Sequence, residues 1–351
     1  MKLVLLFWLL LAISACSNGL VKNNLNAFYK SEIGLKWPAP PSKPRYELIK
    51  IINTIEDFKK EIKAETRIQK FVKWLIGEES ESFLNFGKPF AIYVRDDVIY
   101  IVDQGILGVV TFDLKTARVG VLKDTIEGDL LFYPTSVCSD ETSNVYVTDP
   151  EKKRIVIYDK NGYPISTKKL DNINWRPISI AYSETKKLFY VTDSLNHDIK
   201  IFDKYFNLLK TIGRRGEENG EFNYPTHIFV DDEKGLLFVT DSMNFRVQVF
   251  DLDGRFKSKI GRMGMGDGNL ARPKGVCTDK DGNIYVIDSL QDSIQVFSKD
   301  DRLLAVLGEE GIMPGQFNLP TGIFIDKKNY IYIADSLNRR IQIIKYLGEG
   351  S

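Results

Sequence analysis

The 351-residue chain has few of the residues that most often build metal centres and nucleophilic sites. It contains three cysteines and two histidines. Its formal net charge is +1, so it has no overall basic field for nucleic acid, and we expect no nucleic-acid partner. The apolar run Leu3–Ile13 has eleven residues, too few for the roughly twenty that a membrane-spanning helix needs. We expect neither a cofactor nor a bound metal ion.

The N-terminus has the layout of a secretory signal peptide. Lys2 precedes the apolar run, and residues 13–16 read ISAC. This segment resembles the bacterial lipobox, which implies that residues 1–15 are removed and that Cys16 carries the lipid. Two or more acyl chains hold a protein firmly on a membrane. Because Ser17 rather than an aspartate follows, the resemblance favours the outer membrane of the cell envelope. An ordinary signal with an incidental cysteine is the alternative.

One short pattern returns down the rest of the chain at a nearly constant spacing. Its clearest copies are VTDSLN at 191–196, VTDSMN at 239–244 and IADSLN at 333–338. The repeated aspartates are 44 to 48 residues apart, and a proline opens each unit; the aspartates are Asp103, Asp149, Asp193, Asp241, Asp288 and Asp335, and the prolines are Pro89, Pro134, Pro177, Pro225, Pro273 and Pro320. A period in the forties with strand-like content indicates a repeat architecture.

Each unit contains four short β-branched or aromatic runs separated by Gly, Asn and Asp. Such runs are typical of antiparallel strands joined by hairpins. Six four-stranded units predict an all-β, six-bladed β-propeller over residues 86–347. The repeated aspartates are interpreted as structural acceptors for turn amides.

The units resemble NHL repeats. The residues that carry the resemblance are PTGIFID at 320–326, YIYIADSLNRRIQ at 330–342, and the inter-blade stretches at 213–225 and 308–320. Blades four to six fit closely, whereas QGILG at 104–108 replaces the usual turn in blade one. The resemblance implies the fold and says little about activity, since one fold hosts many functions.

The last unit has no fourth strand, because the chain ends soon after residue 344. We expect the orphan strand at 46–52 to supply it, within a propeller domain that spans 45–348. Helical spacing of apolar residues, with Thr54 and Asp57 as a capping box, predicts a helical insertion over 54–80. Residues 16–44, which end in a proline-rich stretch, are predicted to be a tether. Cys138 and Cys277, three repeats apart, are expected to be buried and unpaired.

Strand alternation places the loop before each proline and the turn after each repeated aspartate at one end of the blades. Tyr, Trp and Arg are the residue types enriched in binding hot spots. We therefore expect a protein or peptide partner to bind there, and the candidate residues are Tyr133, Trp175, Arg176, His197, Tyr224, His227 and Arg272. A propeller hydrolase or lyase that uses His227 at the channel mouth is the alternative. No catalytic set can be read from the spacing, so catalysis is left open.

Overall fold

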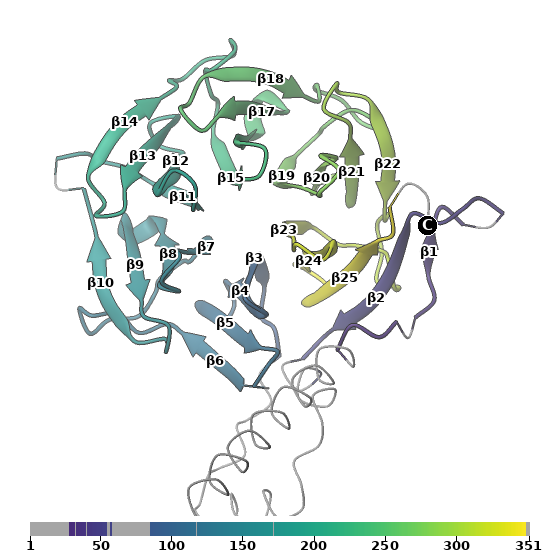
Figure 1. The fold of residues 1–351 in the computed structure, drawn as a ribbon, viewed down its shortest axis with the longest axis horizontal. Helices are drawn as coiled ribbons and strands as arrows, with labels where there is room; N and C mark the ends of the chain where they lie inside the picture. The colour runs from purple at the N-terminus through teal and green to yellow at the C-terminus, as the bar shows by residue number, and fades with distance from the viewer. Residues whose placement is uncertain are drawn as a thin grey trace, which may run out of the picture.

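The computed structural model describes residues 28–31, 33–39, 41–54, 57, 85–116, 118–170 and 172–348. Six antiparallel sheets surround a common axis, with the first strand of each blade innermost (Figure 1). Four-stranded blades repeat around the ring, and the last sheet has five strands. The predicted six-bladed β-propeller is therefore confirmed.

The strands follow in chain order from the centre of each blade outwards. Blades one to three consist of β3 (Pro89–Arg95), β4 (Val98–Asp103), β5 (Gly108–Asp113) and β6 (Arg118–Leu122); β7 (Ser136–Ser139), β8 (Val145–Asp149), β9 (Arg154–Tyr158) and β10 (Pro164–Lys168); and β11 (Pro177–Ser183), β12 (Leu188–Asp193), β13 (Asp198–Asp203) and β14 (Leu208–Ile212).

Blades four to six consist of β15 (Pro225–Asp231), β16 (Leu236–Asp241), β17 (Arg246–Asp251) and β18 (Phe256–Ile260); β19 (Pro273–Thr278), β20 (Ile284–Asp288), β21 (Ser293–Phe297) and β22 (Leu303–Leu307); and β23 (Pro320–Ile325), β24 (Tyr330–Asp335) and β25 (Arg340–Tyr346). Two single-turn 3₁₀ helices, η1 (Pro150–Lys152) and η2 (Ser242–Asn244), form the turns after β8 and β16.

The hydrophobic core lies between neighbouring sheets rather than inside any one of them. In blade four, five of the six residues of β16 and five of the six of β17 are buried, because both faces of these strands are covered by adjacent blades. One core cluster joins Tyr190 and Ile201 of blade three to Leu237 and Phe250 of blade four. Strands buried on both faces are near-continuously apolar. Each blade is thus stabilised mainly by its neighbours.

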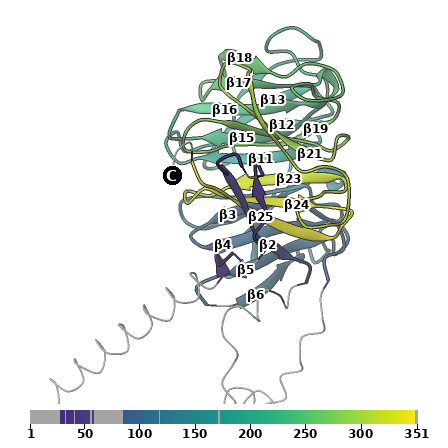
Figure 2. The same ribbon diagram turned by 90° about the vertical axis from the view of Figure 1, so that its right-hand side faces the viewer.

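The N-terminal strand β2 (Tyr46–Ile52) closes the ring. It pairs antiparallel with β25, from Tyr46 opposite Tyr346 to Ile52 opposite Ile341. The purple β2 lies beside the yellow β25 in the axial view (Figure 1) and again in the view turned by 90° (Figure 2). The predicted closing strand is confirmed, and it joins the two ends of the chain within one sheet.

The predicted tether is shorter than residues 16–44, because its described C-terminal part packs on the propeller. The two-residue strand β1 (Lys36–Trp37) pairs with β2 as a fifth strand. Phe28 is buried, and the ring of Tyr29 stacks on Tyr330 with centroids 4.0 Å apart. The sequence pattern does not predict these contacts, because Phe28, Tyr29 and Trp37 are isolated aromatics in a polar segment.

The capping box before the predicted insertion is present. The Thr54 amide donates to Asp57 Oδ2 at 2.9 Å, and the Asp57 amide donates to Thr54 Oγ1 at 3.2 Å. The rest of the insertion, the signal peptide and Cys16 lie outside the described residues. In the described part of the chain, no helix has the length and apolar character needed to cross a membrane. Cys138 and Cys277 are free and buried, as expected.

Truncating Leu48 in the closing strand should destabilise the whole ring. Leu48 is fully buried against blades five and six, so Leu48→Ala should lower the free energy of unfolding by about 2–5 kcal/mol. Urea denaturation measures the change. The matched control is Ile165→Ala in β10, where 46% of the residue is exposed and the loss should stay within about 0.5 kcal/mol. Equal effects of the two substitutions would contradict a closing role for β2.

Candidate binding face

The two ends of the propeller differ in the loops they carry. Each inner strand begins with or just after the repeated proline, at the end where the inter-blade loops and the turns after the repeated aspartates lie; we call this end the proline face. The opposite end carries the hairpins between first and second strands, and we call it the hairpin face. All seven candidate residues belong to loops or strand starts at the proline face or just inside it.

The repeated aspartates organise the proline face from within. All six side chains are fully buried. Each accepts a backbone N–H from one or both of the two residues before the proline of its own blade, as Asp103 does from Gly87 and Lys88, both at 2.8 Å. In the same blade, the amides of Gly105 and Ile106 also donate to Asp103. One carboxylate therefore fastens the inter-blade loop to the turn after the second strand.

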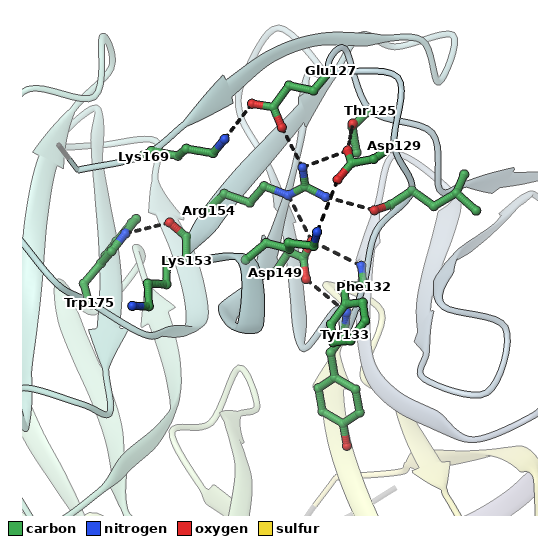
Figure 3. Close-up of polar contacts among 12 residues, drawn as sticks. Thr125, Glu127, Asp129, Phe132, Tyr133, Asp149, Lys153, Arg154, Lys169 and Trp175 are labelled. Atoms are coloured by element: carbon green, nitrogen blue, oxygen red, sulfur yellow. Dashed lines mark hydrogen bonds and ion pairs between the residues drawn. The ribbon is translucent and has the colours of Figure 1, made fainter.

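A cation neutralises the aspartate in four of the six blades. In blade two, Arg154 is 1% exposed, and its Nε donates to Asp149 Oδ2 at 3.0 Å (Figure 3). The rest of this guanidinium bonds Glu127, Asp129 and the carbonyl oxygen of Leu130, which fixes the preceding loop. Lys200, Arg246 and Arg340 take the cationic role in blades three, four and six.

The charge environment of Asp193 favours its ionised form. Burial alone would raise its pKa, but the Arg176 amide, the Asn196 side chain and the ammonium group of Lys200 lower the pKa below its usual value. The structural interpretation of the repeated aspartates agrees with these contacts, because every oxygen faces donors from its own protein.

Arg176 and Tyr224 meet on the proline face although they belong to blades three and four. Arg176 Nη1 donates to the Tyr224 hydroxyl at 2.6 Å, and Arg176 Nη2 pairs with Glu151 Oε1 of blade two at 2.5 Å. Both partners stay partly exposed. Glu151 is not among the predicted site residues; its signal in the sequence is the departure of DPEK at 149–152 from the usual DSLN.

His197 is held in the same cluster by a structural contact. Its Nδ1 accepts the backbone N–H of Tyr224 at 3.0 Å. In blade five, Asp292 occupies the equivalent turn position and accepts the N–H of Leu319 in the same way at 2.6 Å. Both His197 and Asp292 have positive φ, at 55° and 47°. His197 therefore links blades three and four, and Asp292 links blades five and six by the same kind of hydrogen bond.

Trp175 does not lie on the binding face, so this part of the prediction is wrong. Its side chain is 1% exposed, and its indole Nε1 donates to the carbonyl oxygen of Lys153 at 2.9 Å (Figure 3). The ring also packs edge-on against Phe202. A residue two before the proline turns inwards here, because the inter-blade loop folds its apolar side chains between two sheets.

His227 lies inside the channel rather than at its mouth. Its Nδ1 accepts the N–H of Val276 from the next blade at 3.3 Å, and burial lowers its pKa to about 4, so the ring is neutral at pH 7. His227 lines a cavity of about 730 Å³ that extends along the inner strands towards the hairpin face. Aromatic side chains of Tyr93, Phe229 and Phe324 line its wall.

The rim of that cavity is already occupied by ion pairs. Arg95 pairs with Glu184 at 2.8 Å across blade two, and Lys328 pairs with Asp97 at 2.9 Å. Among the described residues, no group of three or more His, Cys, Asp or Glu side chains is placed to hold a metal ion. His227 has no carboxylate among its described hydrogen-bond partners.

Tyr133 and Arg272 lie at the proline face as predicted. The amides of both residues donate to the repeated aspartate of their own blade at 3.0 Å. Tyr133 is 37% exposed, and the Arg272 side chain is free of ion pairs among the described residues. Lys274 follows Arg272 by two residues. It is the one charged residue directly after a repeated proline, although it is not among the predicted site residues.

The proline face also gathers most of the exposed apolar side chains of the described chain. Fourteen of the nineteen large hydrophobic residues that are exposed lie in its loops and turns: Leu107, Ile126, Leu130, Phe132, Tyr133, Leu195, Tyr224, Met243, Met263, Met265, Leu290, Ile312, Met313 and Leu337. Five of these follow the repeated aspartate by two to four residues. The exposed apolar side chains of the described residues are thus concentrated on this face, and large exposed apolar patches are a feature of interaction sites.

Comparisons with known proteins agree on the fold. A family model described as a 6-bladed beta-propeller, DUF5128, matches residues 233–284 and 269–347. No curated protein sequence matches the chain. Among solved structures, an auxiliary nutrient binding protein from Bacteroides thetaiotaomicron is 14% identical, with 75% of this chain and 70% of that chain covered and a TM-score of 0.59.

Two further structures show how widely this architecture is used. A protein of unknown function from Bacteroides thetaiotaomicron is 18% identical over 74% of this chain and 70% of its own, with a TM-score of 0.59. Virginiamycin B lyase from Staphylococcus aureus is 13% identical over 74% of this chain and 94% of its own, with a TM-score of 0.54. Identities this low establish a shared fold, which binding proteins and an enzyme have in common.

Removing a repeated aspartate should cost stability and leave the binding surface in place. Asp241→Ala leaves buried Arg246 without its carboxylate, so we expect a loss of about 3–5 kcal/mol in the free energy of unfolding. The control Asp253→Ala removes a half-exposed carboxylate paired with Lys186 and should change stability by less than about 0.5 kcal/mol. A fully stable Asp241→Ala protein would show that the aspartate is not structural.

Proposed function

We propose that this protein is an NHL-type propeller, held outside the cytoplasm by a lipid on Cys16, that binds a protein or peptide partner on its proline face. The observation that carries the proposal is the concentration of exposed apolar side chains on that face. The hairpin face and the outer strands contribute only five of the nineteen among the described residues. A solvent-exposed ring of Leu, Met, Ile and Phe costs solubility unless a partner covers it.

Polar groups within the apolar ring support a protein partner over a purely lipidic one. Arg176 and Tyr224 are fixed by their mutual hydrogen bond, so little side-chain freedom is lost when they are buried in an interface. Standard interfaces combine apolar anchors with Tyr and Arg and bury about 800 Å² per partner. The auxiliary nutrient binding proteins of similar fold are in line with a binding role at an envelope, although the shared property is the fold.

Site-directed photo-crosslinking in cells tests which face meets the partner. A photoreactive amino acid at Met243 or Leu290, each 55% exposed on the proline face, should give a covalent protein adduct of discrete mass. The same probe at Tyr163 or Tyr205, 70% and 68% exposed in hairpins at the other end, should give none. Adducts from the hairpin positions alone, or from no position, would refute the proposal.

Affinity for the cross-linked partner should depend on the polar cluster. Arg176→Ala removes the contacts to Tyr224 and Glu151 and should weaken binding by about tenfold or more if Arg176 is a hot spot. Its effect on stability should be small, since the ion pair is partly exposed. The control is Lys160→Ala in an exposed hairpin of blade two, which should leave the affinity unchanged.

Lipidation at Cys16 has a separate test. Cells that express the wild-type chain or Cys16→Ala are grown with a clickable fatty acid, and the label and the membrane-bound fraction are measured. Because the thiol is the acceptor in a lipobox, the variant should lose the label and leave the membrane or remain unprocessed. Ser17→Ala, one residue later, should keep the label. Equal labelling of Cys16→Ala and wild type would exclude an anchor at this residue.

A further inference from the structure

Lys274 is the one charged residue at its position in the ring, where blades one and three carry Phe90 and Ile178. It directly follows the repeated proline at the start of β19, where blades two, four and six carry threonine. Thr135 and Thr321 donate to the carbonyl oxygens of Ile178 and Phe90 in the next blade, and Thr226 bonds the Ser242 hydroxyl. The hydroxyls of Thr135 and Thr321 thus link adjacent blades. A lysine ammonium cannot replace them, since its four-carbon stem carries the charge away from the backbone.

Two further cations, Arg272 and Lys88, lie at the same end of the blades as Lys274, next to the starts of β19 and β3. Arg272 lies two residues before Lys274 in blade five, and Lys88 precedes the proline of blade one. Blade six lies between these two blades, and its corresponding residues, Leu319 and Thr321, are uncharged. Within the described part of the chain, none of the three side chains has a hydrogen bond or an ion pair. Burial, followed by repulsion from Arg272 and Lys88, lowers the pKa of Lys274 to about 8.

The buried cations beside the repeated aspartates are, in contrast, all paired with a carboxylate. Arg154, Lys200, Arg246 and Arg340 each contact a repeated aspartate at 3.0 Å or less, and Arg176 has Glu151. A partly buried ammonium beside two like charges is costly, because burial and repulsion both oppose its charge. The cost is removed when an anion enters the site.

We propose that Lys274, Arg272 and Lys88 form an anion-binding site at the proline-face mouth of the channel, which takes a carboxylate from the bound partner. The inference rests on the proposed function for the nature of the ligand. A carboxylate suits the site because Arg and Lys both make short charge-assisted hydrogen bonds to it, and a partly desolvated site strengthens them. The carboxylate can come from an acidic side chain or from a chain terminus.

Binding of short peptides to the full-length protein tests the site directly. Three fluorescent peptides of otherwise equal sequence are compared by anisotropy: one with glutamates and an amidated C-terminus, one with glutamines and a free C-terminus, and one with glutamines and an amidated C-terminus. At least one of the first two should bind, and the third should not. Binding should weaken as salt is raised, as screening requires. The peptide that binds identifies the source of the carboxylate.

The decisive variant is Lys274→Thr, which installs the residue found in blades two, four and six. It should weaken binding of the acidic peptide by about tenfold or more while the protein stays folded. Lys274→Gln, which keeps a polar side chain of similar length, should do the same. The control Lys160→Thr makes the same change in net charge at an exposed hairpin and should bind as the wild type does. Unchanged binding in both Lys274 variants, or equal binding of all three peptides, would overturn the proposal.

Failure of this site and failure of the proposed function give different results. If a partner cross-links at Met243 and Leu290 but the acidic peptides do not bind, the binding face stands and the anion site does not. If the peptides bind through Lys274 while no partner cross-links, the site stands as a receptor for small carboxylates and the protein-binding proposal is wrong.

Discussion

The structure of the proline face depends on one buried carboxylate in each blade. The aspartate at the end of the second strand reaches both the inter-blade loop and the following turn, so the positions of both are set by the same two oxygens. Its charge is balanced in one of two ways. Four blades supply a cation, whereas in blades one and five backbone amides replace it: Asp103 and Asp288 each accept four. Either solution keeps a buried charge satisfied.

In blade one, the turn after the repeated aspartate contains a glycine that allows two backbone segments to approach closely. Gly105 stands where the usual turn has leucine or methionine, and a Cβ built on it would lie 2.5 Å from the Cα of Gly87. The two backbones can approach this closely only because both residues lack a side chain. The approach brings both amides to the Asp103 carboxylate, where Gly87 donates to Oδ2 and Gly105 to Oδ1. In blade five, Asp288 accepts four amides with the usual serine and leucine in its turn, so the two glycines of blade one belong to the close approach of its backbones.

Local patterns predicted the features that repeat, and tertiary contacts decided the rest. Strand order, the closing strand and the structural role of the aspartates follow from periodicity and from the missing fourth strand of the last blade. The burial of Trp175, the packing of Phe28 and Tyr29, and the pairing of Arg176 with Glu151 depend on side chains brought together from distant positions. His197 stands out in the sequence as one of two histidines and is therefore predicted to bind a partner. Its contact is nevertheless structural, because Asp292 makes the same hydrogen bond at the equivalent position of blade five. Comparing equivalent blade positions separates such structural residues from functional ones.

When equivalent positions are compared around the ring, two parts of the proline face differ in their charged side chains. Across blades two to four, Glu151 and Arg176 neutralise each other and Arg176 also donates to the Tyr224 hydroxyl, so this half presents paired polar groups beside apolar side chains. Across blades five to one, Arg272, Lys274 and Lys88 are cations without carboxylate partners among the described residues. Apolar surface supplies most of the affinity in an interface, whereas unbalanced charge fixes orientation and selects against like-charged ligands. A partner that covers the whole face would thus be bound by the ring of Leu and Met and oriented by the position of its own negative charge.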